Sequence, residues 1–254
     1  MHKTQLLATN INLRPIKLIT QLMLLTLNLS AAIAENKFEG PYEQMGIGFN
    51  KTNLNLSSTP LSFSSGQQIA TITPSINDSS GLSGVITGGY LKSINDDFLL
   101  GVSLDVHPFK SSNNNYGLFF SAPASTSISG NLQNRGNYSI SLTPAWVMTP
   151  NSLAYLKLGY VWGTVEKSYT VTPPTPAPVT NVNQSVTLRG SDVGLGFRSL
   201  ISDQLYAFSE FNFVQKTDNN QSNSITLSSG RQANYSVSSG GSYYNLLVGV
   251  GYRF

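Results

Sequence analysis

The strongest constraint on the fold is a period-two alternation of apolar and polar residues that recurs from Pro41 to the end of the chain. The last segment shows it most clearly. One face carries Tyr244, Leu246, Val248, Val250, Tyr252 and Phe254, and the other carries Asn245, Leu247, Gly249, Gly251 and Arg253. Successive side chains of a β-strand point to opposite sides, so this period is typical of strands with one apolar face. It predicts eight strands, near residues 44–50, 84–91, 98–107, 137–148, 154–163, 192–198, 205–213 and 244–254, with the register of the second left open.

The connections between these segments are either short or long. The short ones at 94–97, 149–152 and 201–203 contain the Asn, Asp, Pro and Ser residues that favour turns. The long ones, near 51–80, 108–135, 165–186 and 216–241, are rich in Ser, Asn and Thr. In an antiparallel meander all four long connections lie at the same end. We interpret them as loops, and the proline-rich run Pro173–Pro178 as a stiff, exposed loop tip.

The composition of the polar face indicates which side of the strands points inward. Only 11% of the residues are charged, against about 25% in a typical soluble domain. The polar face consists mainly of Gly, Ser, Thr and Asn, which fit inside a narrow barrel, whereas a solvated exterior carries many Lys and Glu. A soluble barrel with an apolar interior is the alternative. The pattern favours an all-β fold, an eight-stranded antiparallel up-and-down transmembrane β-barrel with short periplasmic turns and four long extracellular loops.

Aromatic residues gather near the ends of the apolar face, as in a membrane barrel. About ten residues at 3.3 Å each, tilted by about 40°, project to about 25 Å, which is the height of an apolar band between two interfaces. We therefore predict an aromatic girdle. Its members are Phe49, Phe98, Tyr138, Trp146, Trp162, Phe213 and Tyr244.

Residues 1–34 have the layout of a secretory signal peptide. Three basic residues precede a leucine-rich stretch and the small-residue site Ala32-Ile33-Ala34. An N-terminal membrane anchor is the alternative interpretation. We expect export through the Sec pathway and a mature barrel domain at 35–254. Removing the three basic residues leaves twelve basic and twelve acidic ones, so the formal charge of +3 gives no reason to expect a nucleic-acid partner.

The ending Leu246, Val248, Val250, Tyr252, Phe254 resembles the C-terminal assembly signal of Gram-negative outer-membrane barrels. The segment from Gly88-Gly89-Tyr90 through Asp97 to Leu100-Gly101 also looks like that class, and the mature chain is similar to the eight-stranded OmpA-like and opacity-type barrels. The resemblance implies location in the outer membrane, contact with its lipid and lipopolysaccharide, and recognition of the last strand by the barrel assembly machinery. In one respect we expect the chain to depart from full OmpA proteins, namely in lacking their periplasmic peptidoglycan-binding domain.

Six charged residues fall on the predicted inner face: Asp105, Lys157, Asp192, Arg198, Glu210 and Arg253. Buried charges require partners. Because Glu210 and Arg198 lie on neighbouring strands above a shared turn, we predict that they pair directly. The cluster is either a structural plug or a gate in a narrow conduction path, and the small interior of an eight-stranded barrel favours the plug.

Nothing in the sequence predicts catalysis, a metal site or a cofactor. His107 is the only histidine of the predicted mature chain, and the nearby Ser111 and Ser112 do not establish a triad. A lone histidine with scattered carboxylates forms no metal-ligand cluster. We expect a surface protein whose barrel presents extracellular loops, with adhesion or another interaction with a host or the environment as its role. A narrow porin-like channel is the alternative, and a lipid-modifying enzyme is a more remote one.

Overall fold

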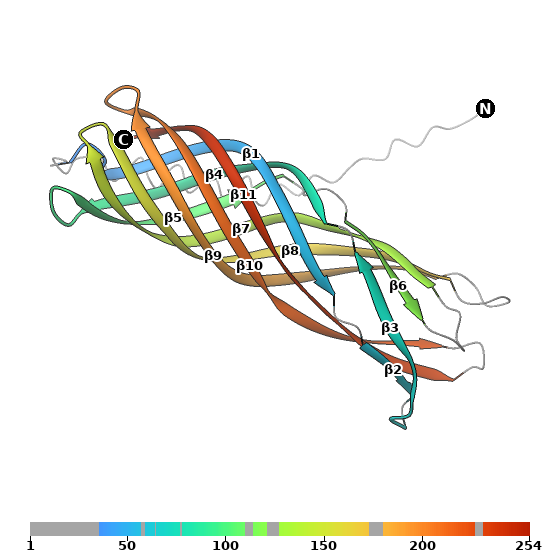
Figure 1. Cartoon of the computed structure of the whole chain (residues 1–254). Helices are drawn as coiled ribbons and strands as arrows, with labels where there is room; N and C mark the ends of the chain where they lie inside the picture. Colours follow the sequence, from blue (N-terminus) through green and yellow to red (C-terminus); the bar gives the residue numbers. More distant parts are fainter. Residues whose placement is uncertain are drawn as a thin grey trace, which may run out of the picture.

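The computed structural model describes residues 36–56, 59–63, 65–76, 78–109, 114–120, 127–172, 180–226 and 231–254. The predicted signal peptide and the run Pro173–Pro178 lie outside these ranges. The described chain is all-β (Figure 1). Its strands are β1 (Gly40–Leu56), β2 (Thr59–Phe63), β3 (Gln68–Ile76), β4 (Ser79–Ser93), β5 (Phe98–His107), β6 (Asn114–Phe120), β7 (Ser127–Thr149), β8 (Ser152–Thr172), β9 (Thr180–Leu200), β10 (Leu205–Thr226) and β11 (Gln232–Arg253).

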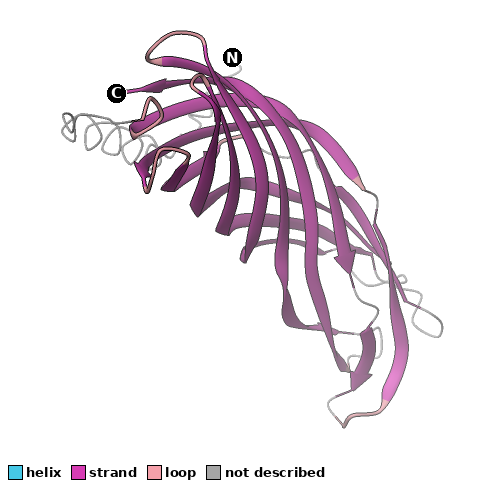
Figure 2. Cartoon of the chain, turned by 60° about the vertical axis from the view of Figure 1, so that its left-hand side comes forward, coloured by secondary structure: helices cyan, strands magenta, loops and turns pink. Residues whose placement is uncertain are grey.

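Eight of these strands close into an antiparallel barrel. The pairing runs β1–β4–β5–β7–β8–β9–β10–β11, and β11 pairs again with β1. Figure 2 shows strands lying side by side along the curved wall of the barrel. The predicted fold class is therefore confirmed. The β1–β4 pairing also fixes the register of the predicted second strand. Gly46 lies opposite Val85 and Ile47 opposite Gly84, so Val85 faces the interior and Ile86 faces outward.

The apolar face of every barrel strand points outward, as predicted. On β11 the side chain of Leu246 is 59% exposed while that of Leu247 is completely buried. The same contrast on β1 separates Ile47, 59% exposed, from the inward-facing Gln44. A continuous exposed apolar belt of this kind is stable only where lipid covers it, and closure leaves no barrel strand edge facing that lipid.

The prediction of four long loops was wrong for most of their length. Strands β7 to β11 extend well past the apolar belt, and β2, β3 and β6 add further strands between β11 and β7. The period of two continues there, because Val165, Val186 and Leu188 are buried while Thr187 and Arg189 are exposed. Ser, Thr and Asn are common in loops, but neighbouring strands satisfy their backbone hydrogen bonds here. The described long connections are therefore mainly β-sheet, which we call the extension.

The extension is open between β9 and β10. These strands pair from Tyr206↔Leu200 to Lys216↔Gly190 and no further in the described residues. A register shift between Lys216 and Asn219 marks a bulge in β10, and a bulged strand bends. Figure 1 shows the outer ends of β10 and β11 beside β2 and apart from those of β8 and β9.

Candidate functional site in the barrel lumen

The lumen is filled by layers of side chains. The layer nearest the short turns is apolar and contains Phe38, Leu91, Leu99, Ala145 and Leu153. Phe38 belongs to the short segment before β1, and no periodicity in the sequence predicts its burial. Above this layer, tyrosines lie flat across glycines of the neighbouring strand. A Cβ on Gly196 would come within 2.0 Å of the Tyr155 ring, and one on Gly251 within 2.2 Å of the Tyr206 ring. The inward glycines therefore provide space for aromatic rings.

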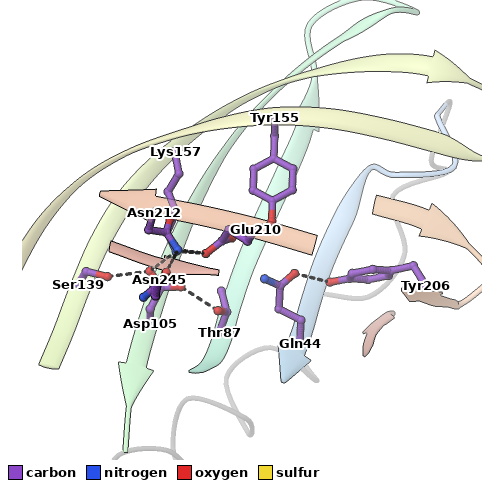
Figure 3. A network of polar contacts seen from close by, with 10 residues as sticks. All are labelled: Gln44, Thr87, Asp105, Ser139, Tyr155, Lys157, Tyr206, Glu210, Asn212 and Asn245. Carbon is purple, nitrogen blue, oxygen red and sulfur yellow. Dashed lines mark hydrogen bonds and ion pairs between the residues drawn. The ribbon is translucent and has the colours of Figure 1, made fainter. Parts of the chain in front are cut away.

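Lys157 on β8 forms the centre of the next layer. Its Nζ lies 3.0 Å from Asp105 Oδ2 and 2.9 Å from Glu210 Oε1, and all three side chains are about 2% exposed or less (Figure 3). Glu210 also accepts hydrogen bonds from Tyr155 Oη at 2.7 Å and from Asn212 Nδ2 at 2.7 Å. Asp105 accepts two further hydrogen bonds, both from hydroxyl groups. Each carboxylate therefore has hydrogen-bond partners in addition to Lys157. A buried ion pair is stable only with such additional hydrogen bonds.

Asp105 is held on both sides by hydroxyl groups. Thr87 Oγ1 donates to its Oδ1 at 2.8 Å, and Ser139 Oγ donates to its Oδ2 at 2.7 Å (Figure 3). These contacts come from β4 and β7, the strands on either side of β5. Together with Lys157 they fix the carboxylate in one orientation.

The predicted Arg198–Glu210 pair is not formed. Arg198 is instead surrounded by three tyrosine rings, with its guanidinium carbon 3.9 Å from the Tyr42 centroid, 4.9 Å from that of Tyr155 and 5.1 Å from that of Tyr206. The prediction assumed that neighbouring strands place the two side chains next to each other. In the structure, Glu210 lies opposite Gly196 and Arg198 lies opposite Phe208. This offset of two residues separates Arg198 from Glu210, and Glu210 pairs with Lys157 instead. The tyrosines were missed because tyrosine on a strand gives no signal for cation–π contact.

Two further predicted members of the charge cluster, Asp192 and Arg253, form no direct ion pair with Lys157 among the described residues. Asp192 is buried in the lumen wall, with no hydrogen-bond partner for its Oδ1 among the described residues. Arg253 lies at the periplasmic rim, where its Nη1 donates to the Glu39 carbonyl at 3.3 Å and its Nη2 to the Asp203 carbonyl at 3.1 Å. Arg253 therefore connects the segment that precedes β1 with the turn that precedes β10.

Glu39 anchors the segment that precedes β1. Its carboxylate accepts hydrogen bonds from Lys92 Nζ at 2.5 Å and from the backbone N–H of Ser93 at 3.3 Å. The hydrogen bond from Lys92 is the main reason that the pKa of Glu39 lies below its ordinary value, and burial acts in the opposite direction. These contacts hold Phe38 in the periplasmic mouth of the barrel.

The upper end of the lumen is closed by a separate polar group. Lys216 Nζ donates to Asn137 Oδ1 at 2.8 Å, and Asn137 Nδ2 donates to Tyr243 Oη at 3.1 Å. His107 is buried opposite Asn137. Ser111 and Ser112 lie outside the described residues. Over the described ranges, no group of three or more His, Cys, Asp or Glu side chains is arranged to hold a metal ion.

The predicted girdle residues all lie on outward-facing positions and form two levels. Phe98 and Trp146 pack edge to face near the short turns, with ring centroids 5.4 Å apart. Tyr138 stacks on Trp162 at 6.4 Å near the extension, and Phe211 lies beside Tyr244 at 6.4 Å. Phe49 and Phe213 are exposed on the same outer face. Amphipathic rings at two heights are typical of membrane interfaces.

The predicted assembly signal forms the outer face of β11. Leu246, Val248, Val250 and Tyr252 are exposed, and Phe254 packs against the Tyr252 ring at 5.1 Å. The backbone N–H of Phe254 donates to the Pro41 carbonyl at 3.1 Å, so the chain end extends the β1–β11 seam. No helix in the described part of the chain is long and apolar enough to span a membrane.

No protein-family model matches the chain, and no curated protein matches it. Solved structures with a similar chain path include the outer membrane protein OprG from Pseudomonas aeruginosa, with 13% identity and a TM-score of 0.47, covering 87% of this chain and 99% of OprG. Ail, the attachment invasion locus protein of Yersinia pestis, in complex with the heparin analogue sucrose octasulfate, has 14% identity and a TM-score of 0.37, covering 84% and 99%. Neisserial surface protein A has 14% identity and a TM-score of 0.33, covering 85% and 100%.

The fold assignment rests on the geometry of the chain itself. A closed eight-stranded antiparallel barrel carries an apolar outer belt, aromatic rings at two heights and a polar, filled lumen. The chain therefore forms an eight-stranded antiparallel β-barrel of the transmembrane type.

Proposed function

We propose that the protein is a surface-interaction protein of the outer membrane, in which the barrel anchors the extension for binding of partners outside the cell. The observation that carries the proposal is the open wall between β9 and β10. Above Gly190, β9 pairs only with β8, and above Lys216, β10 pairs only with β11 in the described residues. The barrel itself has no free strand edge. The backbone N–H and C=O groups that could bind a partner strand therefore lie in the extension.

The chemistry of these two edges supports binding of an extended protein segment. An unpaired strand edge presents a row of N–H and C=O groups that another strand can join, and proteins usually protect such edges with Lys or Pro. The sequence between 180 and 188 contains no charged residue and no proline, and neither does that between 219 and 226. The inner face of β9 adds apolar contacts through Val186 and Leu188. The proposed partner is a host or environmental protein with an exposed extended segment.

The test compares two pairs of substitutions at the same heights. Asn183→Glu with Thr187→Glu places charge on the free edge of β9. Ser168→Glu with Thr164→Glu alters their direct partners on β8, which is paired on both sides. Vesicles carrying each variant are assayed for adhesion to host cells and to immobilised extracellular matrix. We expect the β9 pair to lose at least tenfold in adhesion and the β8 pair to keep it. No adhesion by the unchanged protein, or equal loss in both pairs, would overturn the proposal.

A narrow channel is the less favoured function. The filled layers at Lys157, at Arg198 and at Phe38 argue against an open path through the lumen. Planar-bilayer recording of the purified barrel tests this directly, and stable conductance steps would support the channel. We also propose that the protein is not an enzyme. Loss of a lipid-modifying activity in His107→Ala would contradict this.

We further propose that lipid and lipopolysaccharide surround the apolar belt, and that the barrel assembly machinery recognises β11 during biogenesis. The exposed apolar face of β11 supports the second proposal.

A further inference from the structure

A row of buried polar side chains crosses the lumen wall at the height of Gly159. Ser103, Ser141, Gly159 and Asp192 are successive cross-strand partners on β5, β7, β8 and β9. The three side chains face inward, and each residue is 2% exposed. Directly opposite residues of antiparallel strands have Cβ atoms about 5 Å apart, so the row brings several oxygen atoms to one height.

Gly159 has no side chain, and the hydroxyl group of Ser141 leans into the space that a Cβ would take; we call this place the recess. A Cβ at this position would lie 2.3 Å from Ser141 Oγ and 3.3 Å from Asp192 Cβ. The serine and the aspartate therefore lean over the glycine from opposite sides. The recess is therefore bounded by the Ser141 hydroxyl group on one side and by the Cβ of Asp192 on the other.

Three oxygen atoms of this row lack a hydrogen-bond partner in the part of the chain that the structure describes. Over the described residues, Ser103 Oγ, Ser141 Oγ and Asp192 Oδ1 are all buried without a hydrogen bond. Burying polar atoms in this way is costly, and most costly for a carboxylate. Asp105 and Glu210 differ, because each is held by Lys157 and by further hydrogen bonds. Asp192 is thus the carboxylate of this region that needs a further partner.

The charges facing the recess favour a cation as that partner. The ammonium group of Lys157 is already shared by Asp105 and Glu210. Arg198 is enclosed by tyrosine rings, and Lys216 donates to Asn137. In the described part of the lumen, neither forms an ion pair with Asp192.

We propose that the recess binds one monovalent alkali cation, sodium, through the Asp192 carboxylate and the Ser141 hydroxyl, with Ser103 and water completing the shell. Oxygen donors suit hard cations. Calcium takes six to eight oxygen ligands and magnesium requires a near-ideal octahedron, whereas the recess offers few protein oxygens and only one carboxylate that lacks a partner.

The test is thermal unfolding of the full barrel in a zwitterionic detergent, followed by heat-modifiable gel migration. Sodium chloride replaces choline chloride at constant ionic strength. A ligand that binds only the folded state raises the unfolding midpoint in a saturable way. We expect this rise in the unchanged protein and in the control Asp203→Asn, which removes an exposed carboxylate. Asp192→Asn should abolish the dependence.

A second variant keeps the test decisive if Asp192→Asn fails to fold. Ser141→Ala retains the charge but removes a ligand, so half-saturation should require at least a tenfold higher sodium concentration. Three results would overturn the proposal: no sodium dependence in the unchanged protein, an undiminished dependence in Asp192→Asn or in Ser141→Ala, or stabilisation by calcium without stabilisation by sodium.

Discussion

Lys157 is the residue whose replacement tests the layered lumen most directly. Its ammonium group lies about equally close to Asp105 and Glu210, in a layer that is almost completely buried. At an effective dielectric constant of about 20, each attraction at 3 Å amounts to about 5.5 kcal/mol before desolvation is counted. Removing one partner of a buried pair typically costs about 3–5 kcal/mol, because the remaining charge is left uncompensated.

We therefore expect Lys157→Met to lower the free energy of unfolding by about 3–5 kcal/mol. Methionine has similar length and fits the same space, so the loss reports charge rather than a cavity. The measurement is urea unfolding in detergent micelles, monitored by tryptophan fluorescence and by heat-modifiable gel migration. A loss below about 1 kcal/mol would refute the reasoning, since it would mean that Lys157 does not compensate the two carboxylates.

A neutral triple variant separates charge from packing. Lys157→Met combined with Asp105→Asn and Glu210→Gln removes all three charges together. Replacing a complete buried ion-pair group is often neutral or stabilising, so most of the stability should return. If the triple variant is as unstable as Lys157→Met alone, packing and not charge accounts for the loss.

Three further predictions concern other parts of the barrel. Because its folded pKa is lowered, Glu39 contributes stability above its ordinary pKa of about 4.5, and that contribution is lost as pH falls through the folded value. Glu39→Gln should therefore flatten the acid limb of a pH–stability curve, and an unchanged limb would contradict the Lys92 contact. Arg198→Met should destabilise the barrel by about 2 kcal/mol in the same urea assay, since a desolvated cation–π contact is worth about that much; a neutral result would rule out the contact as a source of stability. Phe254→Ser should change the stability of the refolded barrel by less than about 1 kcal/mol but reduce the heat-modifiable form in outer-membrane fractions several-fold; equal effects on both would assign Phe254 a structural role alone.

The barrel strands were predictable because lipid and lumen impose alternation along every strand. Residues such as Leu246 and Leu247 differ in exposure for that reason alone. The extension was not predictable as strand, because its Ser, Thr and Asn residues are equally common in loops. These residues form strands because neighbouring strands provide partners for their backbone N–H and C=O groups. Ser168, for example, pairs with Asn131 on one side and with Asn183 on the other.

The candidate site was only partly predictable. Alternation placed Asp105, Lys157 and Glu210 on the inner face, which the structure confirms. Their partners depend on the stagger between strands, which the sequence does not contain. A shift of two residues along β9 separates the predicted partner Arg198 from Glu210 and leaves that carboxylate to Lys157.

The sequence by itself determined the all-β class, the number of barrel strands and the outward direction of their apolar face. These follow from a periodicity that each strand carries locally and that a membrane enforces on one side. The tertiary structure alone decided the ion pairs of the lumen, the enclosure of Arg198 by three tyrosines, the plug formed by Phe38 and the open wall between β9 and β10. The physical reason is that these features arise from contacts between residues on different strands, and the stagger and closure of the barrel set those contacts.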